Sequence, residues 1–420
     1  MNTEKATSGP RILVFSSLFP STAEPGAGLF IRERMFRVAE HLPMVVVAPR
    51  PWFPGQGLIR LFRPHFRPPA PRFEIDDGIE VHRPRFLSLP GLCKWADGRM
   101  MALGAARTVR RLKRRLGIDI MDAHFLYPDG YAATRIARKL NLPSTITLRG
   151  TETRMAADPR LRPLLIQAAK EATRLFAVAN SLAHVAEELG APSNKIRVIG
   201  NGVDSQRFQP QDRAEARAAL HIPKDARVMI SVGTLVERKG FHRVIECLPE
   251  LCVRYPDLRY LIVGGAGPEG DWSQHLRECA EQLSVEGRVQ LLGHRTPDEL
   301  PEILSTADVF VLATANEGWA NVFLEAMGCG LPVVTTDVGG NREVVSGPSL
   351  GAIVPFGDSE ALTQALDRTL ATQWNTTTIR DYARNNDWAR RVEVLVDAFE
   401  SLVGAAATSS REANQGGTKR

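Results

Sequence analysis

Two glutamates, Glu317 and Glu325, are the strongest chemical signal in this sequence. The short apolar run Val309–Leu312 comes just before them and predicts a buried strand. Glu317 then falls in the loop after the strand, and Glu325 about two turns into the following helix. A carboxylate can accept hydrogen bonds from two neighbouring hydroxyl groups. The pair therefore suits a polyhydroxylated ligand, although two glutamates at this spacing alone are more often solvated surface charges.

A pair of cations, Arg238 and Lys239, is the second signal. They follow the apolar run 227–232 and precede a helical stretch, so we expect them at a helix entrance. Adjacent positive charges there suit a diphosphate, which gains negative charge as it leaves. Phosphate also fits the start of the glutamate-bearing helix, where Asn321 and Val322 offer backbone N–H groups and the positive end of the helix dipole. Most Arg-Lys pairs are solvated, so the position after a strand carries this interpretation.

Glycines and one histidine follow other apolar runs. Gly28 comes after the first run, and the turn 264–267 after a later one. Glycine lets the backbone approach a phosphate or a sugar closely. His124 ends the run 118–124, on the side where a ligand would bind. A lone histidine in such a place is more often a structural residue than a ligand contact.

Short β-branched runs alternate with amphipathic stretches in both halves of the chain. This alternation predicts parallel sheets with helices on both faces. Ligands of such sheets bind outside the carboxyl ends of the strands, where the residues above lie. The expected strands are 11–17, 43–48, 118–124, 144–148, 175–179, 196–199, 227–232, 260–263, 289–291, 309–312, 333–335 and 352–354.

The fold class that we expect is α/β, with two doubly wound Rossmann-like domains and an active site in the cleft between them. The predicted boundaries are 1–200 for the first domain and 201–385 for the second. The stretch 200–210 is rich in Gly, Asn, Asp and Pro and suits a hinge. Residues 386–404 predict a helix that packs back on the first domain, and 405–420 a small, polar, disordered tail.

Composition places the chain among ordinary globular proteins, with 420 residues, 44% hydrophobic and 24% charged. Its five cysteines are scattered and show no metal-ligand spacing, which predicts neither a disulfide framework nor a metal site. No apolar start resembles a signal peptide, and no run reaches the roughly 18 apolar residues of a membrane span. We expect a cytoplasmic protein.

The net charge of +6 comes from one region. Between Arg50 and Arg115 there are fifteen Lys or Arg and five Asp or Glu, while the rest of the chain is slightly acidic. Within this region 51–71 combines prolines with aromatic, aliphatic and arginine residues, a composition suited to the interface of an anionic membrane. The alternatives are a loop folded over the core for 51–71 and a solvated helix face for 107–115. No feature favours nucleic acid.

Together these segments resemble glycosyltransferase family 4, the retaining enzymes of the GT-B fold. The resemblance runs from Ile12 to Phe399 and rests on five motifs in the same order. They are Gly28-Leu-Phe-Ile-Arg-Glu-Arg34, Asp122-Ala-His124 with Tyr127-Pro-Asp-Gly130, Asn201-Gly-Val-Asp204 with Phe208, Gly233-Thr-Leu-Val-Glu-Arg-Lys239-Gly240, and Glu317 with Glu325.

The resemblance implies that 1–200 is an acceptor-side domain and 201–385 a nucleotide-sugar domain. It also implies roles for matching positions. Gly28 would lie near the donor diphosphate and His124 beside the donor sugar and the reaction centre. Lys239 would contact the diphosphate, Glu317 the hydroxyls of the donor sugar and Glu325 those of the ribose.

Further positions follow from the same resemblance. The base of the nucleotide would lie near Gly293, His294 and Arg295, and the donor close to Gly339 and Gly340. The family works without a bound metal, so we expect no metal and no cofactor, the nucleotide sugar being the donor substrate.

Three departures from the family pattern bear on these roles. Thr234 stands where many relatives have an arginine, and Arg238 is our candidate for the missing phosphate cation. Asp122 replaces the first histidine of the family's His-x-His pair, and Glu152 replaces an aspartate. The last two concern the acceptor side.

The expected reaction is retaining, metal-independent transfer of a glycosyl group from a nucleotide-diphosphate sugar to a glycan. The acceptor could be carried on a polyprenyl lipid at the inner face of the cytoplasmic membrane. The alternatives are a nucleotide-sugar epimerase of the same architecture and a non-catalytic nucleotide-sugar binder. A dehydrogenase is disfavoured, because no GxGxxG follows the first strand.

Overall fold

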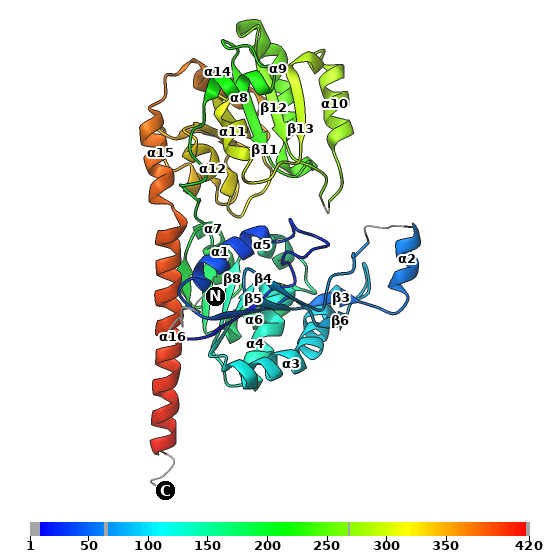
Figure 1. Ribbon diagram of the computed structural model, residues 1–420, viewed down its shortest axis with the longest axis vertical. Helices are drawn as coiled ribbons and strands as arrows, with labels where there is room; N and C mark the ends of the chain where they lie inside the picture. The colour runs from blue at the N-terminus through cyan, green and yellow to red at the C-terminus, as the bar shows by residue number, and fades with distance from the viewer. Residues whose placement is uncertain (1–8, 63–65, 268, 417–420) are drawn as a thin grey trace, which may run out of the picture. The chain divides into compact units, whose positions relative to one another are not determined.

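The computed structural model describes residues 9–62, 66–267 and 269–416, which belong to two compact units. Unit 1 is Met1–Gly200 with Arg391–Arg420, and unit 2 is Asn201–Arg390. Each unit is built on a twisted, mainly parallel sheet with helices packed on it (Figure 1). The predicted fold class, two Rossmann-like α/β domains, is confirmed.

The sheet of unit 1 has eight strands in the order β10-β9-β8-β7-β1-β2-β5-β4. All neighbouring strands are parallel except β4, which runs antiparallel to β5. Its strands are β1 (Ile12–Phe15), β2 (Met44–Val47), β4 (Phe73–Asp76), β5 (Ile79–His82), β7 (Ile120–His124), β8 (Ser144–Leu148), β9 (Arg174–Ala177) and β10 (Ile196–Val198). A separate parallel pair is formed by β3 (Arg50–Trp52) and β6 (Arg85–Leu87).

The helices of unit 1 bury one apolar face each. In α3 (Asp97–Leu116) the buried residues Met101, Ala105, Val109 and Leu112 recur every three or four positions, as a helix face requires. Gly117, with φ of 68°, then ends that helix. The other helices are α1 (Leu29–Ala39), α2 (Gln56–Phe62), α4 (Tyr131–Lys139), α5 (Thr151–Ala156), α6 (Arg162–Glu171) and α7 (Asn180–Glu188), with short turns η1 (Lys94–Ala96), η2 (Leu126–Gly130) and η3 (Ser193–Lys195).

The sheet of unit 2 has six parallel strands in the order β13-β12-β11-β14-β15-β16. The strands are β11 (Val228–Val232), β12 (Arg259–Val263), β13 (Val289–Gly293), β14 (Val309–Leu312), β15 (Val333–Thr336) and β16 (Gly351–Val354). The helices are α8 (Arg213–Ala219), α9 (Phe241–Arg254), α10 (Ser273–Gln282), α11 (Leu300–Ser305), α12 (Asn321–Gly328), α13 (Asn341–Val344), α14 (Ser359–Ala371) and α15 (Thr376–Asn385), with short turns η4 (Glu237–Lys239) and η5 (Glu286–Arg288).

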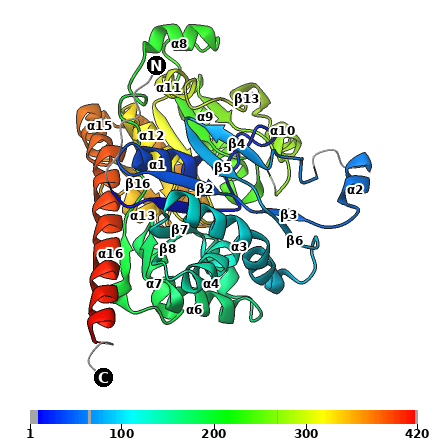
Figure 2. The same cartoon turned by 60° about the horizontal axis from the view of Figure 1, so that its bottom comes forward.

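The last helix, α16 (Trp388–Gly416), returns to unit 1 and completes its core. Val392, Leu395 and Phe399 lie on one face and are buried with side chains of α1 and the sheet. The ring of Phe399 meets that of Phe176 edge to face, with centroids 5.9 Å apart. Both views place α16 alongside α1 (Figures 1 and 2).

The prediction of a disordered tail at 405–420 is corrected for 405–416, because α16 continues to Gly416, while 417–420 lie outside the described residues. The stretch after Val403 contains four alanines, two glutamate or arginine side chains and no proline before Gly416. These residues are compatible with helix, so the helix that starts in the core has no residue that must stop it.

Each sheet has a topological switch point, where successive strands start to add on the other side. In unit 2 the switch lies between β11 and β14, and in unit 1 between β1 and β7. Loops leaving the carboxyl ends of such neighbouring strands diverge and leave room for a ligand. The loops after β11 and β14 carry Lys239 and Glu317, and those after β1 and β7 carry Gly28 and Asp129.

Segment 50–87, which includes the proline-rich stretch 51–71, has regular secondary structure that the sequence analysis did not predict. It contains β3, α2, β4, β5 and β6, although residues 63–65 lie outside the described part of the chain. None of the helices in the described ranges is both long and apolar enough to cross a bilayer.

Candidate functional site

In unit 2 the loops after β11 and β14 are tied together at the switch point. The carbonyl of Arg238 accepts hydrogen bonds from the Thr314 hydroxyl (3.0 Å) and from the backbone N–H of Ala315 (2.7 Å). Gly240 has φ of 74°, and a Cβ there would lie 1.9 Å from the carbonyl oxygen of Ala313. Only glycine allows this approach, so the loop position of Lys239 depends on it.

Lys239 and Glu317 form an ion pair across these two loops. Their side chains are only 14% and 10% exposed, so the pair is largely withdrawn from water. An ion pair in such surroundings is stronger than on the surface. The two residues that sequence patterns assigned to a diphosphate and to sugar hydroxyls are thus brought together, and Glu317 neutralises Lys239.

The glycines after β15 hold the backbone of Glu317. The N–H of Gly340 donates to the Glu317 carbonyl at 3.2 Å. Gly339 has φ of 52°, and a Cβ on it would lie 1.8 Å from that same oxygen. The structure therefore brings Gly339 and Gly340 to the Glu317 loop, where they touch its backbone.

Helix α12 begins directly after the same loop. Asn321 is its first residue, and its side-chain oxygen accepts a hydrogen bond of 2.9 Å from the amide of Asn201. Glu325 follows one turn later and is half-buried, on the same helix face as Asn321. Val322 is also half-buried. Asn201 was part of a quoted motif, but the sequence did not predict this contact.

The expected base-binding residues follow β13. Gly293 has φ of 72°, and its carbonyl accepts from the N–H of Gly264 at 2.9 Å. His294 is exposed, and Arg295 donates to Glu299 at 3.2 Å. Thr234, after β11, has its methyl group next to Gly267. These residues come from neighbouring carboxyl ends of one sheet.

Arg238 points to a different partner from the one predicted. Its Nε lies 3.0 and 3.1 Å from the two carboxylate oxygens of Glu269, in the loop after β12. Both side chains are substantially exposed. Arg238 is thus next to Lys239 in sequence, while its charge is already balanced by a carboxylate.

In unit 1 the backbone packs closely around Gly28 at the switch point. This glycine precedes α1 with φ of 72°, and a Cβ there would lie 2.4 Å from the carbonyl oxygen of Leu18. Next to it, the Asp129 carboxylate accepts hydrogen bonds from the backbone N–H and the hydroxyl of Ser17, the latter at 2.9 Å. Burial raises the pKa of Asp129 to about 7.

His124, at the end of β7, has no exposed side-chain surface. Its Nδ1 accepts a hydrogen bond of 3.1 Å from Arg149, because a guanidinium can only donate. Nε2 lies 3.4 Å from an oxygen of Asp122. Burial, with the charges of Arg149 and Arg34, holds the pKa of His124 well below its usual value. The ring is neutral and carries its proton on Nε2.

Buried charges surround this histidine, and sequence patterns did not assign them roles. Arg34 of α1 is fully buried and donates to the carbonyl of Ile199 at 3.3 Å. Asp122 accepts a hydrogen bond of 2.6 Å from the Thr145 hydroxyl, and burial raises the pKa of Asp122 to about 6. Arg34 and Asp122 belong to quoted motifs, which were the available signal, but their convergence required the tertiary structure.

Glu152 organises the adjacent loop. Its carboxylate accepts hydrogen bonds from three backbone N–H groups, those of Leu126 (3.2 Å), Arg149 (3.2 Å) and Gly150 (2.7 Å). Burial raises its pKa, while these hydrogen bonds act in the opposite direction. Glu152 therefore fixes the loop that carries Arg149.

Comparisons with known proteins cover both units. The family described as "Glycosyltransferase Family 4" matches residues 36–207, and "Glycosyl transferases group 1" matches residues 212–386. The putative teichuronic acid biosynthesis glycosyltransferase TuaC of Bacillus subtilis is 28% identical over 85% of this chain and 88% of its own length. A D-inositol 3-phosphate glycosyltransferase of Corynebacterium urealyticum is 36% identical over 54% of this chain and 56% of its own length.

Solved structures share the fold at low sequence identity. HepE of Anabaena, in complex with UDP and glucose, superposes with a TM-score of 0.71 at 18% identity, over 94% of this chain and 100% of that one. Sucrose-phosphate synthase of Thermosynechococcus elongatus gives 0.68 at 18% identity, over 97% and 100%.

Proposed function

Because the chain belongs to glycosyltransferase family 4 and transfers a glycosyl group from a nucleotide sugar, we propose that the transfer is retaining, needs no metal ion and uses a glycan as acceptor. The observation that carries this proposal is the Lys239–Glu317 pair at the switch point of unit 2. The family assignment favours transfer over the epimerase and binder alternatives.

On the donor side, the Lys239 ammonium leaves Glu317 and pairs with the diphosphate when a nucleotide sugar binds. The freed Glu317 carboxylate then accepts hydroxyls of the donor sugar, and Glu325 those of the ribose. Gly339 and Gly340 allow the donor close to the backbone, and the loop at Gly293 receives the base. The complexes of HepE with UDP support uridine as that base.

Retention follows if the leaving diphosphate takes the proton of the acceptor hydroxyl on the face from which it departs. Lys239 and the N–H groups at the start of α12 stabilise the charge that grows on that oxygen. His124 is neutral and cannot supply a positive charge. Because its side chain is fully buried and its Nδ1 accepts a hydrogen bond from Arg149, we assign it the role of positioning the Arg149 guanidinium, with no direct contact to the donor.

The donor proposal is tested by thermal shift with UDP-, GDP- and ADP-sugars. A bound donor raises the melting temperature of the folded protein, and Lys239→Ala removes most of that shift. NMR of a reaction that contains the donor and a soluble glycan acceptor then follows the anomeric configuration of the product. We expect the anomeric configuration of the donor to be kept, and the rate to be unchanged by a chelator. An inverted product, loss of activity with the chelator, or C2 inversion without acceptor would contradict the proposal.

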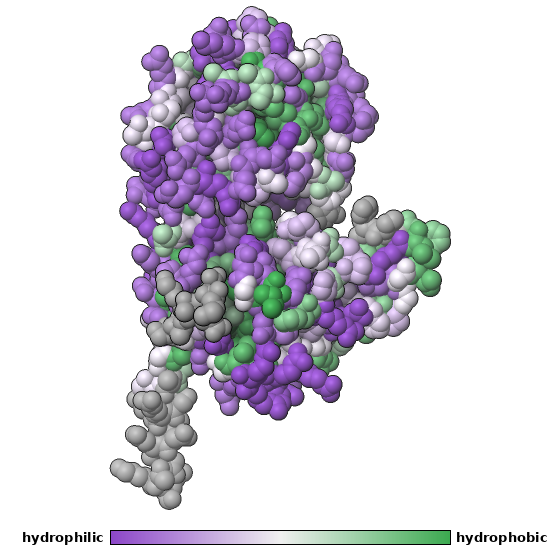
Figure 3. Space-filling view, in the orientation of Figure 1, coloured by the Kyte–Doolittle hydropathy of each residue, from purple (hydrophilic) through white to green (hydrophobic). Residues whose placement is uncertain are grey.

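For the acceptor side we propose peripheral contact with an anionic membrane through α2. Its side chains Leu58, Leu61 and Phe62 are 67, 74 and 86% exposed. They form the apolar patch over α2 in Figure 3, beside hydrophilic surface. Apolar groups in the lipid with arginines at the headgroups are the pattern of interfacial helices.

Vesicle co-sedimentation tests this contact. The double variant Leu61→Ser with Phe62→Ser should lose most binding to vesicles that contain anionic lipid. Val253→Ser is the matched control, because Val253 is 85% exposed in unit 2, outside the patch. Equal sedimentation of the double variant and the control would refute membrane contact through α2.

A further inference from the structure

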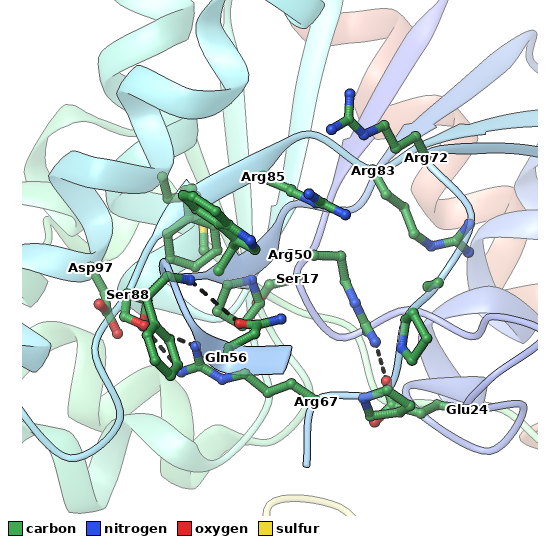
Figure 4. A pocket seen from close by; sticks show the side chains of 18 of the residues that line it. Ser17, Glu24, Arg50, Gln56, Arg67, Arg72, Arg83, Arg85, Ser88 and Asp97 are labelled. Carbon is green, nitrogen blue, oxygen red and sulfur yellow. Dashed lines mark hydrogen bonds and ion pairs between the residues drawn. The ribbon is translucent and has the colours of Figure 1, made fainter. Parts of the chain in front are cut away.

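A cavity of about 440 Å³ in unit 1 has no role in the reaction described so far. It opens at the carboxyl edge of the sheet, next to Ser17 after β1, Arg83 after β5 and Pro128 after β7. The β3–β6 pair and α2 form its other sides (Figure 4). It therefore lies on the edge where ligands of parallel sheets bind.

The lining is strongly basic. Two acidic residues, Glu24 and Asp97, face seven basic ones. Glu24 is paired with Arg50, and Asp97 lies 3.1 Å from Lys94. The remaining five cations are Arg60, Arg67, Arg72, Arg83 and Arg85.

Arg83 is the most telling of these cations, because it is almost fully buried. One nitrogen, Nη2, donates to the carbonyl of Pro20 at 2.6 Å and to Glu74. Nε and Nη1 are buried and have no hydrogen-bond partner among the residues that the structure describes. Burying a guanidinium with two unsatisfied donors costs free energy, unless a ligand accepts hydrogen bonds from them.

Arg72 and Arg85 stand at the rim, near Arg83 in Figure 4. Both are exposed, and within the described ranges neither side chain makes a hydrogen bond or an ion pair. Arg67, deeper in the cavity, is held in place by Ser88, with Nη1 2.8 Å from its carbonyl. The cavity thus combines fixed cations with two that are available to a ligand.

Apolar groups line the same cavity, among them Trp52, Phe53 and Phe86. A neighbouring cavity of about 360 Å³ shares Lys94, Asp97 and Pro128 with it. Together they offer an anion site with apolar walls and additional space beside it.

We infer that this cavity binds the phosphoryl group of the acceptor. Guanidinium groups bind phosphate oxygens through two parallel hydrogen bonds, and a phosphate monoester brings up to two negative charges to an excess of positive ones. The inference rests on the proposed function, since it assigns the acceptor chemistry of the same enzyme. The phosphoryl group can belong to a lipid carrier or to a soluble sugar phosphate.

The test uses the double variant Arg72→Ala with Arg85→Ala, since both side chains are exposed and should be dispensable for folding. Calorimetry with citronellyl phosphate, at saturating UDP so that the donor site is filled, measures the affinity of the cavity. We expect at least about a tenfold loss in the double variant, from the loss of charged hydrogen bonds. Arg111→Ala is the control, because this exposed arginine of α3 lines neither cavity.

Equal affinity of the double variant and the control, or no binding to the native protein, would overturn the inference. So would glucuronate binding as tightly as the phosphate, because the site would then recognise any anion. Glucose 1-phosphate binding as well as citronellyl phosphate would identify a soluble sugar phosphate as the source. Tighter binding of the prenyl compound would identify a lipid.

Donor turnover separates this inference from the proposed function. If a nucleotide sugar binds and is slowly hydrolysed at the same rate by native protein and double variant, the donor site is intact. Unchanged hydrolysis with an unchanged acceptor KM then refutes only the phosphoryl site. Absence of any nucleotide-sugar binding refutes the proposed function itself.

Discussion

Lys239 and Glu317 neutralise each other, although each is proposed to serve a different part of the donor. Their pairing satisfies a largely buried ammonium and a largely buried carboxylate. An unpaired buried charge would cost free energy, so the pairing allows both charged groups to be present in the proposed site. Replacing one partner therefore affects both binding and the surroundings of the other.

Lys239→Ala should weaken UDP binding at least about tenfold, because a charged hydrogen bond contributes about 1.5–3 kcal/mol. Arg238→Ala should have a smaller effect, because Glu269 already balances that guanidinium. Calorimetry of both variants with UDP measures the difference. If Arg238→Ala costs as much as Lys239→Ala, Arg238 does replace the cation missing at Thr234.

Asp129 predicts a pH dependence of stability. Its pKa is raised to about 7 in the folded protein, against an ordinary value of 3.8. The folded state therefore holds a proton that the unfolded state releases, and stability falls as pH rises from about 4 to about 7. Asp129→Asn removes this contribution. Its melting temperature, measured across that range, should fall less than that of the native protein.

Asp122 titrates in part of the same range, since its pKa is about 6. It is present in both proteins, so only the difference between the two melting curves reports on Asp129. Parallel curves would show that the Asp129 carboxyl is not protonated in the fold.

At the scale of elements, the proposed donor site consists of loops that follow β11, β14 and β15 and are joined by backbone contacts. Gly240 and Gly339 allow these contacts, each with a positive φ and a neighbouring carbonyl where a Cβ would be. Main-chain packing therefore fixes the positions of the loops, and with them the positions of their side chains.

Gly339→Ala should reduce donor affinity and stability together, by several kcal/mol for the latter, because the new Cβ would collide with the Glu317 carbonyl. Gly357→Ala is the matched control, since its φ of 84° is also positive but its Cβ would meet nothing within 4 Å. Chemical denaturation and UDP titration measure both effects. Similar losses in the two variants would mean that the strained φ, not the contact with Glu317, is responsible.

At the scale of the whole molecule, the chain crosses from unit 1 to unit 2 and returns through α16. The return is part of the unit 1 core, where Val392, Leu395 and Phe399 are buried. The first 200 residues therefore do not contain the complete hydrophobic core of their own unit. A fragment that ends before α16 exposes the apolar surface that this helix covers.

Phe399→Ala should destabilise unit 1 by about 3–5 kcal/mol, the usual cost of removing a buried phenylalanine. Glu400→Ala, an exposed neighbour on the same helix, should change stability by less than about 0.5 kcal/mol. Denaturant unfolding of the two variants compares them. Equal midpoints would show that α16 contributes little to the core.

The sequence by itself determined the two α/β units, the strands that build most of both sheets and the family, because buried parallel strands leave short β-branched runs between helical stretches. It also predicted Lys239 and Glu317 as candidate site residues, since both follow such runs. The strands of segment 50–87 were missed, because their prolines and charges conceal strands that are only partly buried.

Only the tertiary structure decided which charges meet. The pairing of Arg238 with Glu269, the buried group around His124 and the basic cavity each join residues that are distant in sequence. Arg50 and Arg85 line one cavity because β3 and β6 pair in register, which no local pattern reveals. Strand formation is set by local hydrophobic periodicity, whereas the neighbours of a side chain depend on strand order and long-range packing.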